Sequence, residues 1–167
     1  MKTIVLIRHA KSDWAAGLED HKRPLSPRGL TDAPKVAAQA GALAGDKPVI
    51  YSSTAKRAMQ TAIIFSNSWG VTTGEITFAD ALYTFDHSRL EAFIATLADT
   101  LDKVFIFGHN EAITDFVNKF GNIYIDNVPT AGLVELLLPT DSWRKIVRGS
   151  TGTVIFPKDL KHGQHDL

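Results

Sequence analysis

Short apolar runs recur along the chain, and several of them end directly in polar or glycine residues. The first, TIVLI at 3–7, is almost wholly apolar and rich in β-branched residues, the pattern of a strand covered on both faces of a sheet. Further runs predict strands at 48–51, 76–78, 104–107, 133–138 and 153–156. We expect the last two near the edge of the sheet, and 143–147 is a candidate for one more strand.

Helices are predicted between these strands. Ser26 followed by Pro27 is typical of a helix N-terminus, and the small-residue segment after it suits a helix that stops near Gly45. Pro34 either kinks this helix or marks its true start. Three more helices are expected, from caps at 52–54 to about Ser66, from Asp86 (or Ser88 with Glu91) to about Leu97, and from about Glu111 to Phe120.

Strands that alternate with helices predict an α/β fold, a three-layer sandwich with a mainly parallel central sheet flanked by helices. We expect a single domain over 1–160 and a polar tail at 161–167. In such sheets ligands bind beyond the carboxyl ends of the strands. Polar residues that directly follow predicted strands, or lie one helical turn further on, should therefore meet there: Arg8, His9, Ser52, Ser53, Arg57 and His109.

Composition removes several classes of function. The 167 residues include 18 Lys and Arg against 18 Asp and Glu, so no net charge would attract nucleic acid or an anionic membrane. The chain has no cysteine, which excludes disulfides, thiolate metal sites and a cysteine nucleophile. The apolar run before Arg8 is too short for a secretion signal, and no stretch is long enough to span a membrane. We expect a cytoplasmic protein.

Two histidines and two arginines that meet at strand ends suit a phosphoryl group. Guanidinium groups match phosphate oxygens with paired hydrogen bonds and stay charged at physiological pH. A neutral imidazole can attack phosphorus and leave again from the phosphohistidine that forms. This chemistry requires no metal and no other cofactor.

Three motifs resemble those of the histidine phosphatase superfamily, whose fold is that of phosphoglycerate mutase. Arg8-His9-Ala10 resembles its Arg-His-Gly signature, 52–62 its second-arginine motif and 108–110 its second-histidine motif. Further segments resemble the short SixA-like phosphohistidine phosphatases: RHAKSDW at 8–14, DHKRPLSPRG at 20–29 and PTAG at 129–132. The interval between Arg57 and His109 leaves no room for the large cap of other members, so we expect an open site.

The resemblance implies a role for each matching residue. His9 would be the nucleophile, and Arg8, Arg57 and His109 would bind the phosphate. The implied substrate is phosphohistidine on a signalling or phosphotransfer protein, with inorganic phosphate as product. Two alternatives stay open: a phosphatase acting on a small phosphomonoester, and a phosphate-binding module of low activity.

The general acid of the larger members is unassigned, because the corresponding stretch reads Leu82-Tyr83-Thr84 and has no carboxylate. An imidazole leaving group needs a protonating acid far less than an alkoxide does, so this absence favours phosphohistidine. Other residues with candidate roles are more often structural. Asp13, Asp20 and Asp86 are the nearest candidate acids, although solvated or salt-bridged carboxylates are more common. Lys22, Arg23 and Arg28 are candidates to line the mouth of the pocket and meet an acidic protein partner, although a solvated face is more common. We expect packing for Trp14, Trp69 and Trp143, an ordinary cap and helix surface for Ser53 and Thr61, and no metal site at His162 and His165.

Overall fold

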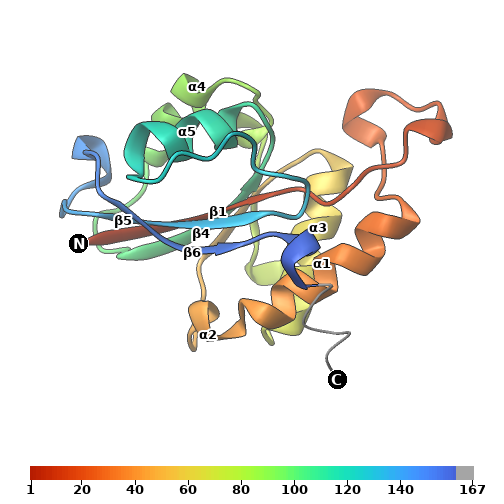
Figure 1. Ribbon diagram of the computed structural model, residues 1–167, viewed down its shortest axis with the longest axis horizontal. Coiled ribbons are helices and arrows are strands. Elements are labelled where there is room, and N and C mark those ends of the chain that lie inside the picture. Colours follow the sequence, from red (N-terminus) through yellow and green to blue (C-terminus); the bar gives the residue numbers. More distant parts are fainter. Residues whose placement is uncertain (161–167) are drawn as a thin grey trace.

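The computed structural model describes residues 1–160, and within them six strands form one sheet between two layers of helices (Figure 1). The strands are β1 (Lys2–Arg8), β2 (Ile50–Ser53), β3 (Thr77–Ala79), β4 (Lys103–Gly108), β5 (Leu133–Leu138) and β6 (Ser150–Ile155). Their order is β3-β2-β4-β1-β5-β6, and only β5 runs against its neighbours. The predicted mainly parallel α/β sandwich is confirmed.

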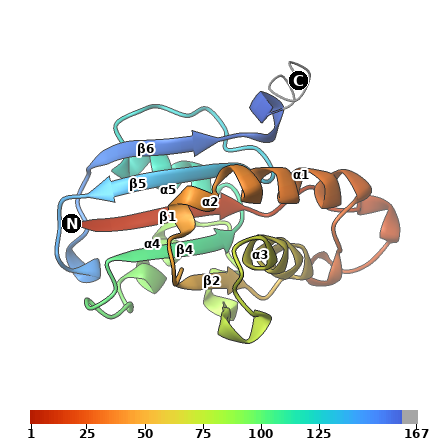
Figure 2. The same cartoon turned by 90° about the horizontal axis from the view of Figure 1, so that it is seen from below.

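The helices cover the two faces of the sheet unequally. Figure 2 shows one group crossing the near face, while the other group lies behind the sheet. The near group is α1 (Pro27–Gln39), α2 (Gly41–Ala44) and α3 (Lys56–Ser68), and the far group is α4 (His87–Ile94) and α5 (Ala112–Phe120). Because side chains alternate along a strand, β1 supplies both cores, with Val5 packed in the cluster of α1 and α3 and Leu6 in that of α4 and α5.

Several helix boundaries differ from those predicted. α1 begins at Pro27, and the Ser26 hydroxyl accepts a hydrogen bond from the backbone N–H of Gly29, as expected for an N-cap. Pro34 lies inside α1, so it does not mark the start of the helix. α3 begins at Lys56, after a position without a side-chain cap, so the cap predicted at 52–54 is wrong. α4 follows its Asp86 cap but ends at Ile94, before Leu97.

The extra strand proposed at 143–147 is also wrong. Trp143–Lys145 is a short 3₁₀ helix, and Trp143 is buried. Its backbone N–H donates to the Asp99 carboxylate and its indole N–H to the Leu101 carbonyl, which satisfies the ring inside a loop rather than a sheet. The tail predicted at 161–167 lies outside the described residues. No helix of the described chain is long and apolar enough to cross a membrane.

Candidate active site

A pocket of about 470 Å³ opens at the carboxyl ends of β1, β2 and β4. All four predicted site residues line it, although they come from three separate parts of the chain. The register of β1 and β4 pairs Arg8 with Gly108, so the next residue of each strand, His9 and His109, lies at the same level of the sheet. The full lining is Arg8, His9, Lys11, Ser12, Trp14, Asp20, Arg23, Arg57, Phe85, His109, Asn110 and Thr130.

The hydrogen bonds of His9 define its tautomer. Its Nδ1 atom lies 2.7 Å from the carbonyl oxygen of Ala10, and a carbonyl can only accept, so Nδ1 carries the proton. The Nε2 atom lies 3.4 Å from Nε of Arg57, which can only donate. The lone pair of His9 is therefore on Nε2, which faces the pocket.

His109 has the complementary arrangement. Its Nδ1 atom lies 3.5 Å from Nη2 of Arg57 and therefore acts as an acceptor, whereas its Nε2 atom lies 2.8 Å from the Ser53 hydroxyl. Nε2 donates its proton to that hydroxyl. The two imidazole centroids are 5.3 Å apart, and the unprotonated nitrogen of each ring faces the Arg57 guanidinium.

Both histidines are neutral at physiological pH. Burial lowers the pKa of His9 to about 3; the Ala10 carbonyl opposes this shift, and Arg57 and Arg8 add to it. Burial lowers the pKa of His109 to about 2, with further contributions from His9 and Arg57. A neutral imidazole with a free lone pair is the form in which histidine acts as a nucleophile.

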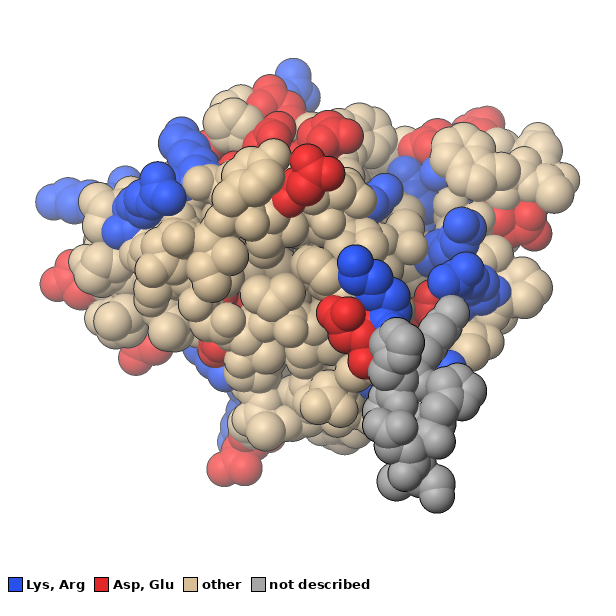
Figure 3. Space-filling view, in the orientation of Figure 1, with Lys and Arg blue, Asp and Glu red and all other residues tan. Residues whose placement is uncertain are grey.

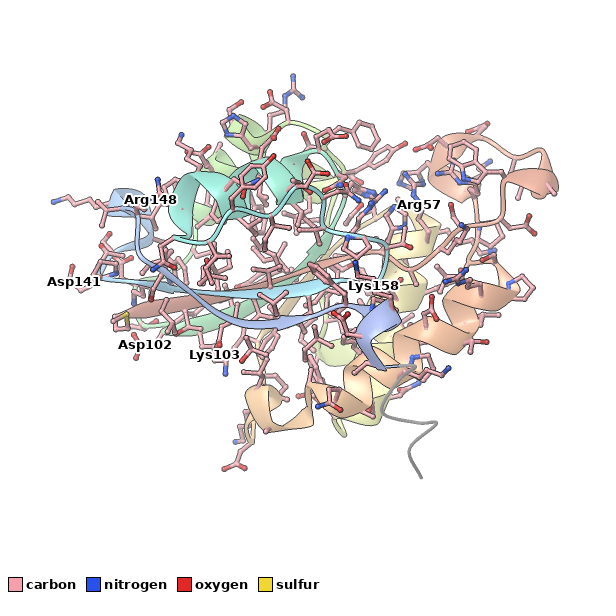
Figure 4. All side chains as sticks on the ribbon, in the orientation of Figure 1. Arg57, Asp102, Lys103, Asp141, Arg148 and Lys158 are labelled. Carbon is pink, nitrogen blue, oxygen red and sulfur yellow. The ribbon has the colours of Figure 1, made fainter. Side chains whose placement is uncertain are left out.

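Arg57 is held in the first turn of α3 with its side chain only 2% exposed. Figure 4 shows it at the end of the sheet, beside the loop that follows β1. Its Nη1 donates to the Asp20 carbonyl at 2.6 Å, and its Nη2 donates to the Asp20 carboxylate at 2.9 Å. One turn later in α3, the Thr61 hydroxyl accepts from the N–H of Ala10 and donates to the carbonyl of Arg57, which ties the helix to the loop after His9.

Arg8 differs from Arg57 in that one buried nitrogen of its guanidinium group has no hydrogen-bond partner among the described residues. That nitrogen is Nε, whereas Nη1 donates to the Val128 carbonyl at 2.9 Å. Burial lowers the pKa of Arg8, although Glu111 opposes the shift. A buried donor of this kind requires an explanation, and an oxyanion in the pocket would supply one.

Two close backbone contacts fix the wall behind the histidines. The backbone N–H of Ala131, a residue with φ of 62°, lies within hydrogen-bonding distance of the carbonyls of both Arg8 and His9. On the other side, the Lys11 carbonyl accepts from the N–H and hydroxyl of Ser26. A Cβ on Gly29 would lie 2.2 Å from the same carbonyl, so only glycine fits there.

Asp20 is the one carboxylate among the described pocket residues. Partial burial would raise its pKa, but hydrogen bonds from Tyr83, Arg23 and Arg57 outweigh this effect and hold the pKa well below its usual range. Asp20 is therefore ionised and has no proton to donate. The other two candidate acids lie elsewhere: Asp13 caps the turn at 14–16, and Asp86 caps α4.

Several residues expected to be ordinary belong to the site. Ser53 and Thr61 are buried and bond to His109 and Ala10, while Arg23 is buried at the pocket wall. Thr61 could have been found from its spacing, because positions four apart share a helix face with Arg57. Asp20 and Arg23 lie in the segment 20–29 that resembles the SixA-like proteins, but a solvated surface is the expectation for both.

Of the remaining predictions, on three tryptophans and two basic residues, only the one for Trp14 is wrong. Trp69 and Trp143 pack as expected, whereas Trp14 is largely exposed at the pocket, so the packing prediction for it is wrong. Lys22 and Arg28 are exposed, as predicted, and Arg28 pairs with Asp32.

The pocket has an excess of positive charge that the whole chain does not show. Figure 3 shows acidic and basic side chains mixed over one face of the molecule. The pocket lining instead sets four basic residues against Asp20, namely Arg8, Lys11, Arg23 and Arg57. Within residues 1–160, no cluster of His, Asp or Glu side chains is arranged to hold a metal ion. The site can bind a multiply charged anion beside an unprotonated imidazole nitrogen.

Solved structures with the same fold include known phosphatases. The structure of a protein histidine phosphatase SixA complexed with tungstate matches with a TM-score of 0.78 at 17% identity, over 95% of this chain and 99% of that one. A protein from Agrobacterium tumefaciens assigned as the phosphohistidine phosphatase SixA matches at 0.65 with 25% identity, over 80% of this chain and 90% of that one. A mycobacterial glucosyl-3-phosphoglycerate phosphatase in complex with VO3 matches at 0.70 with 16% identity, over 92% and 98%.

Sequence relatives match over shorter segments. An uncharacterised chloroplast protein of Arabidopsis thaliana is 43% identical over 61 residues, which are 36% of this chain and 28% of that protein. An uncharacterised protein of Mycobacterium tuberculosis is 42% identical over 55 residues, 33% of this chain and 35% of that protein. The matched segments thus span about a third of these relatives. The sequence profile of the histidine phosphatase superfamily (branch 1) matches residues 4–87, about half of the chain, and the protein belongs to that superfamily, with a fold like that of the SixA proteins.

Proposed function

We propose that residues 1–160 act as one cytoplasmic phosphatase domain in which His9 attacks phosphorus. The observation that supports this most directly is the tautomer of His9, whose Nε2 lone pair faces a pocket rich in guanidinium groups. A protein that only binds phosphate needs the arginines but has no use for an unprotonated imidazole held in this way. The geometry therefore favours an enzyme over a binding module.

The proposed reaction has two displacements. Nε2 of His9 forms a bond to phosphorus as the bond to the leaving group breaks, and the leaving group takes the electron pair. Water then attacks phosphorus, Nε2 recovers its electron pair, and the proton of the water passes to solvent, which yields inorganic phosphate. Arg8 and Arg57 hold the phosphoryl oxygens and neutralise their charge, so the reaction needs no metal.

His109 is the second proposed phosphate ligand. Its Nδ1 lone pair faces Arg57, so it can donate to a phosphoryl oxygen only after it takes up a proton. A bound dianion would favour that proton by raising the pKa of the buried imidazole. Ser53 keeps the ring in position through the hydrogen bond at Nε2.

We propose phosphohistidine as the substrate because no protonated carboxyl group lines the pocket within residues 1–160. The carboxylate that lines the pocket, Asp20, is ionised by its three donors. A leaving imidazole, with a reference pKa of about 6.5, can depart with little help from an acid, whereas an alkoxide cannot. Two similar structures, both SixA proteins, have names that state activity on phosphohistidine or protein histidine.

A small phosphomonoester is the second candidate substrate. The glucosyl-3-phosphoglycerate phosphatase with the same fold acts, by its name, on such a compound. For this chain to do so, Asp20 would have to exchange its arginine partners for a proton when substrate binds.

The test compares hydrolysis of a phosphohistidine-bearing phosphotransfer protein with that of an aryl phosphate, in the presence of a chelator. The variants are His9→Ala and, as a matched control, His87→Ala, since His87 contacts Glu91 on α4 and does not line the pocket. We expect phosphohistidine to be preferred, His9→Ala to lose at least about 10³-fold in rate, and His87→Ala to behave as the native protein.

Each other outcome has a defined meaning. Turnover retained in His9→Ala would eliminate the proposed nucleophile. Preference for the ester would identify a phosphomonoesterase with Asp20 as the first acid to examine. No turnover of either substrate, with phosphate still bound, would identify a binding module.

A further inference from the structure

Two exposed aromatic side chains stand at the mouth of the phosphate pocket. Trp14, in the loop after β1, is 75% exposed, and Phe85, in the segment before α4, is 53% exposed. Both line the pocket that contains His9. Neither contributes to the buried core clusters, so core packing does not explain them.

One face of Trp14 packs against Arg23, which shares the Asp20 carboxylate with Arg57. The Arg23 guanidinium lies over the Trp14 ring, 3.6 Å from the centroid. Arg23 is itself buried and anchored, because its Nε donates to the Ser12 hydroxyl at 2.8 Å and its Nη1 to the Asp20 carboxylate at 2.7 Å. One face of the indole therefore rests on a fixed cation while much of the side chain stays open to solvent.

Phe85 packs against different residues, namely His109 and Tyr83. Its ring lies 5.5 Å from the ring of His109 at an interplanar angle of 72°, an edge-to-face contact, and 5.8 Å from the ring of Tyr83. Trp14 is therefore supported from the loop after β1, and Phe85 from the residue that follows β4, and both side chains line the same pocket.

Exposed apolar rings that rim a polar pocket are typical of a surface that contacts a ligand. The phosphoryl group itself gains nothing from them, since its oxygens are served by the arginines and histidines. The part of the substrate that reaches the rim is the group that carries the phosphoryl group. Aromatic faces bind planar rings by stacking or edge-to-face contact.

We propose that Trp14 and Phe85 are specificity-determining residues that select substrates whose phosphoryl group is carried on a planar ring. This inference rests on the proposed phosphatase function. A histidine side chain on a protein and the ring of a small aryl phosphate share this chemistry, and the substrate comparison above distinguishes these two sources.

The test uses phosphonates, whose carbon–phosphorus bond is not hydrolysed, so that binding is measured without turnover. Phenylphosphonate and methylphosphonate differ in the ring alone, and calorimetry gives a dissociation constant for each. We expect phenylphosphonate to bind about threefold to tenfold more tightly than methylphosphonate. In Trp14→Ala and Phe85→Ala this ratio should fall toward one, and Trp14→Phe should restore part of it.

Tyr124→Ala is the matched control, because Tyr124 is 78% exposed and lies outside the lining of this pocket. It should keep the native ratio. Circular dichroism checks that each variant is folded. A ratio unchanged in both Trp14→Ala and Phe85→Ala, or a native ratio near one, would overturn the aromatic selection and leave the phosphatase function intact. Failure of the native protein to bind either phosphonate would overturn both.

Discussion

The end of β1 and the loop that follows it are consecutive in the chain but are built in different ways. Residues 4–7 are buried between two helical layers, and their apolar side chains alternate between the two cores. The loop over 10–25 instead contains two short 3₁₀ helices and is anchored by polar contacts, such as those of Asp20 with Arg57 and Arg23.

This difference separates two tasks at one site. The strand places His9 beside His109 through a register that the whole sheet maintains. The loop supplies residues that adjust the charge and access of the pocket, with Asp20 and Arg23 in direct contact. Changes in the loop should therefore alter binding and selectivity, whereas changes at the strand ends should alter the reaction itself and the stability of the sheet around it.

The largest effect that separates the two regions should come from acid. His9 and His109 have pKa values of about 3 and about 2 in the folded protein, below the value near 6.5 expected when unfolded. At pH values between the folded and the unfolded pKa, the unfolded chain binds more protons than the folded protein does. The free energy of unfolding must therefore fall as the pH falls below about 6.5. Each histidine contributes up to about 1.4 kcal/mol per pH unit, or about 5 kcal/mol for both at pH 4.5.

Urea unfolding between pH 7 and 4.5 measures this dependence. The double variant His9→Asn/His109→Asn should show a much flatter profile. An equally steep profile in the variant would mean that other groups cause the acid sensitivity.

The contact that locks the loop to α1 should have the next largest effect. Gly29→Ala places a Cβ against the Lys11 carbonyl and should lower the free energy of unfolding by about 2 to 3 kcal/mol. Gly41→Ala is the control, because a Cβ there meets nothing within 4 Å and should be neutral or slightly stabilising. Equal thermal stability of the two variants would show that the loop yields to the added methyl group.

The smallest effect should come from the charge of the loop. Asp20→Asn removes a negative charge that shares Arg57 and Arg23 with any bound anion. We expect inorganic phosphate to bind about threefold to tenfold more tightly, a modest gain because Asp20 is partly exposed to solvent. Calorimetry at low ionic strength measures the change, and Asp13→Asn, in the same loop but outside the pocket lining, should leave it unaltered. Weaker binding in Asp20→Asn would show that the carboxylate orients Arg57 rather than competing for it.

The sequence predicted correctly those parts of the fold in which apolar and polar residues follow a regular pattern. The apolar run of β1 and the recurrence of strand, turn and helix predicted both the sheet and the edge where His9 and His109 meet. Prediction failed where a side chain is positioned by tertiary contacts of an irregular loop. Asp20 contacts Arg57 in a loop that is fixed to α1 by the hydrogen bond between Ser26 and Lys11. The path of such a loop cannot be predicted from the spacing of apolar and polar residues.

The same limit explains the error at Trp14. A tryptophan in an apolar or mixed segment is more often packed than exposed. Here Arg23 supplies the packing partner from the loop itself, which leaves the ring at the surface. The 3₁₀ helix at Trp143 is a related case, because its indole is satisfied by a backbone carbonyl that only the folded chain brings near.

The pairing of β1 with β4 also bears on how the protein acquires activity during folding. Thr3 pairs with Lys103, so the central contact of the sheet joins residues about a hundred positions apart, and contacts of this range form slowly. On a ribosome, the segment with His9 emerges long before the strand that places His109. A nascent chain therefore has its proposed nucleophile early but has no assembled site, and appearance of the proposed phosphatase activity would report completion of the sheet rather than formation of any local element.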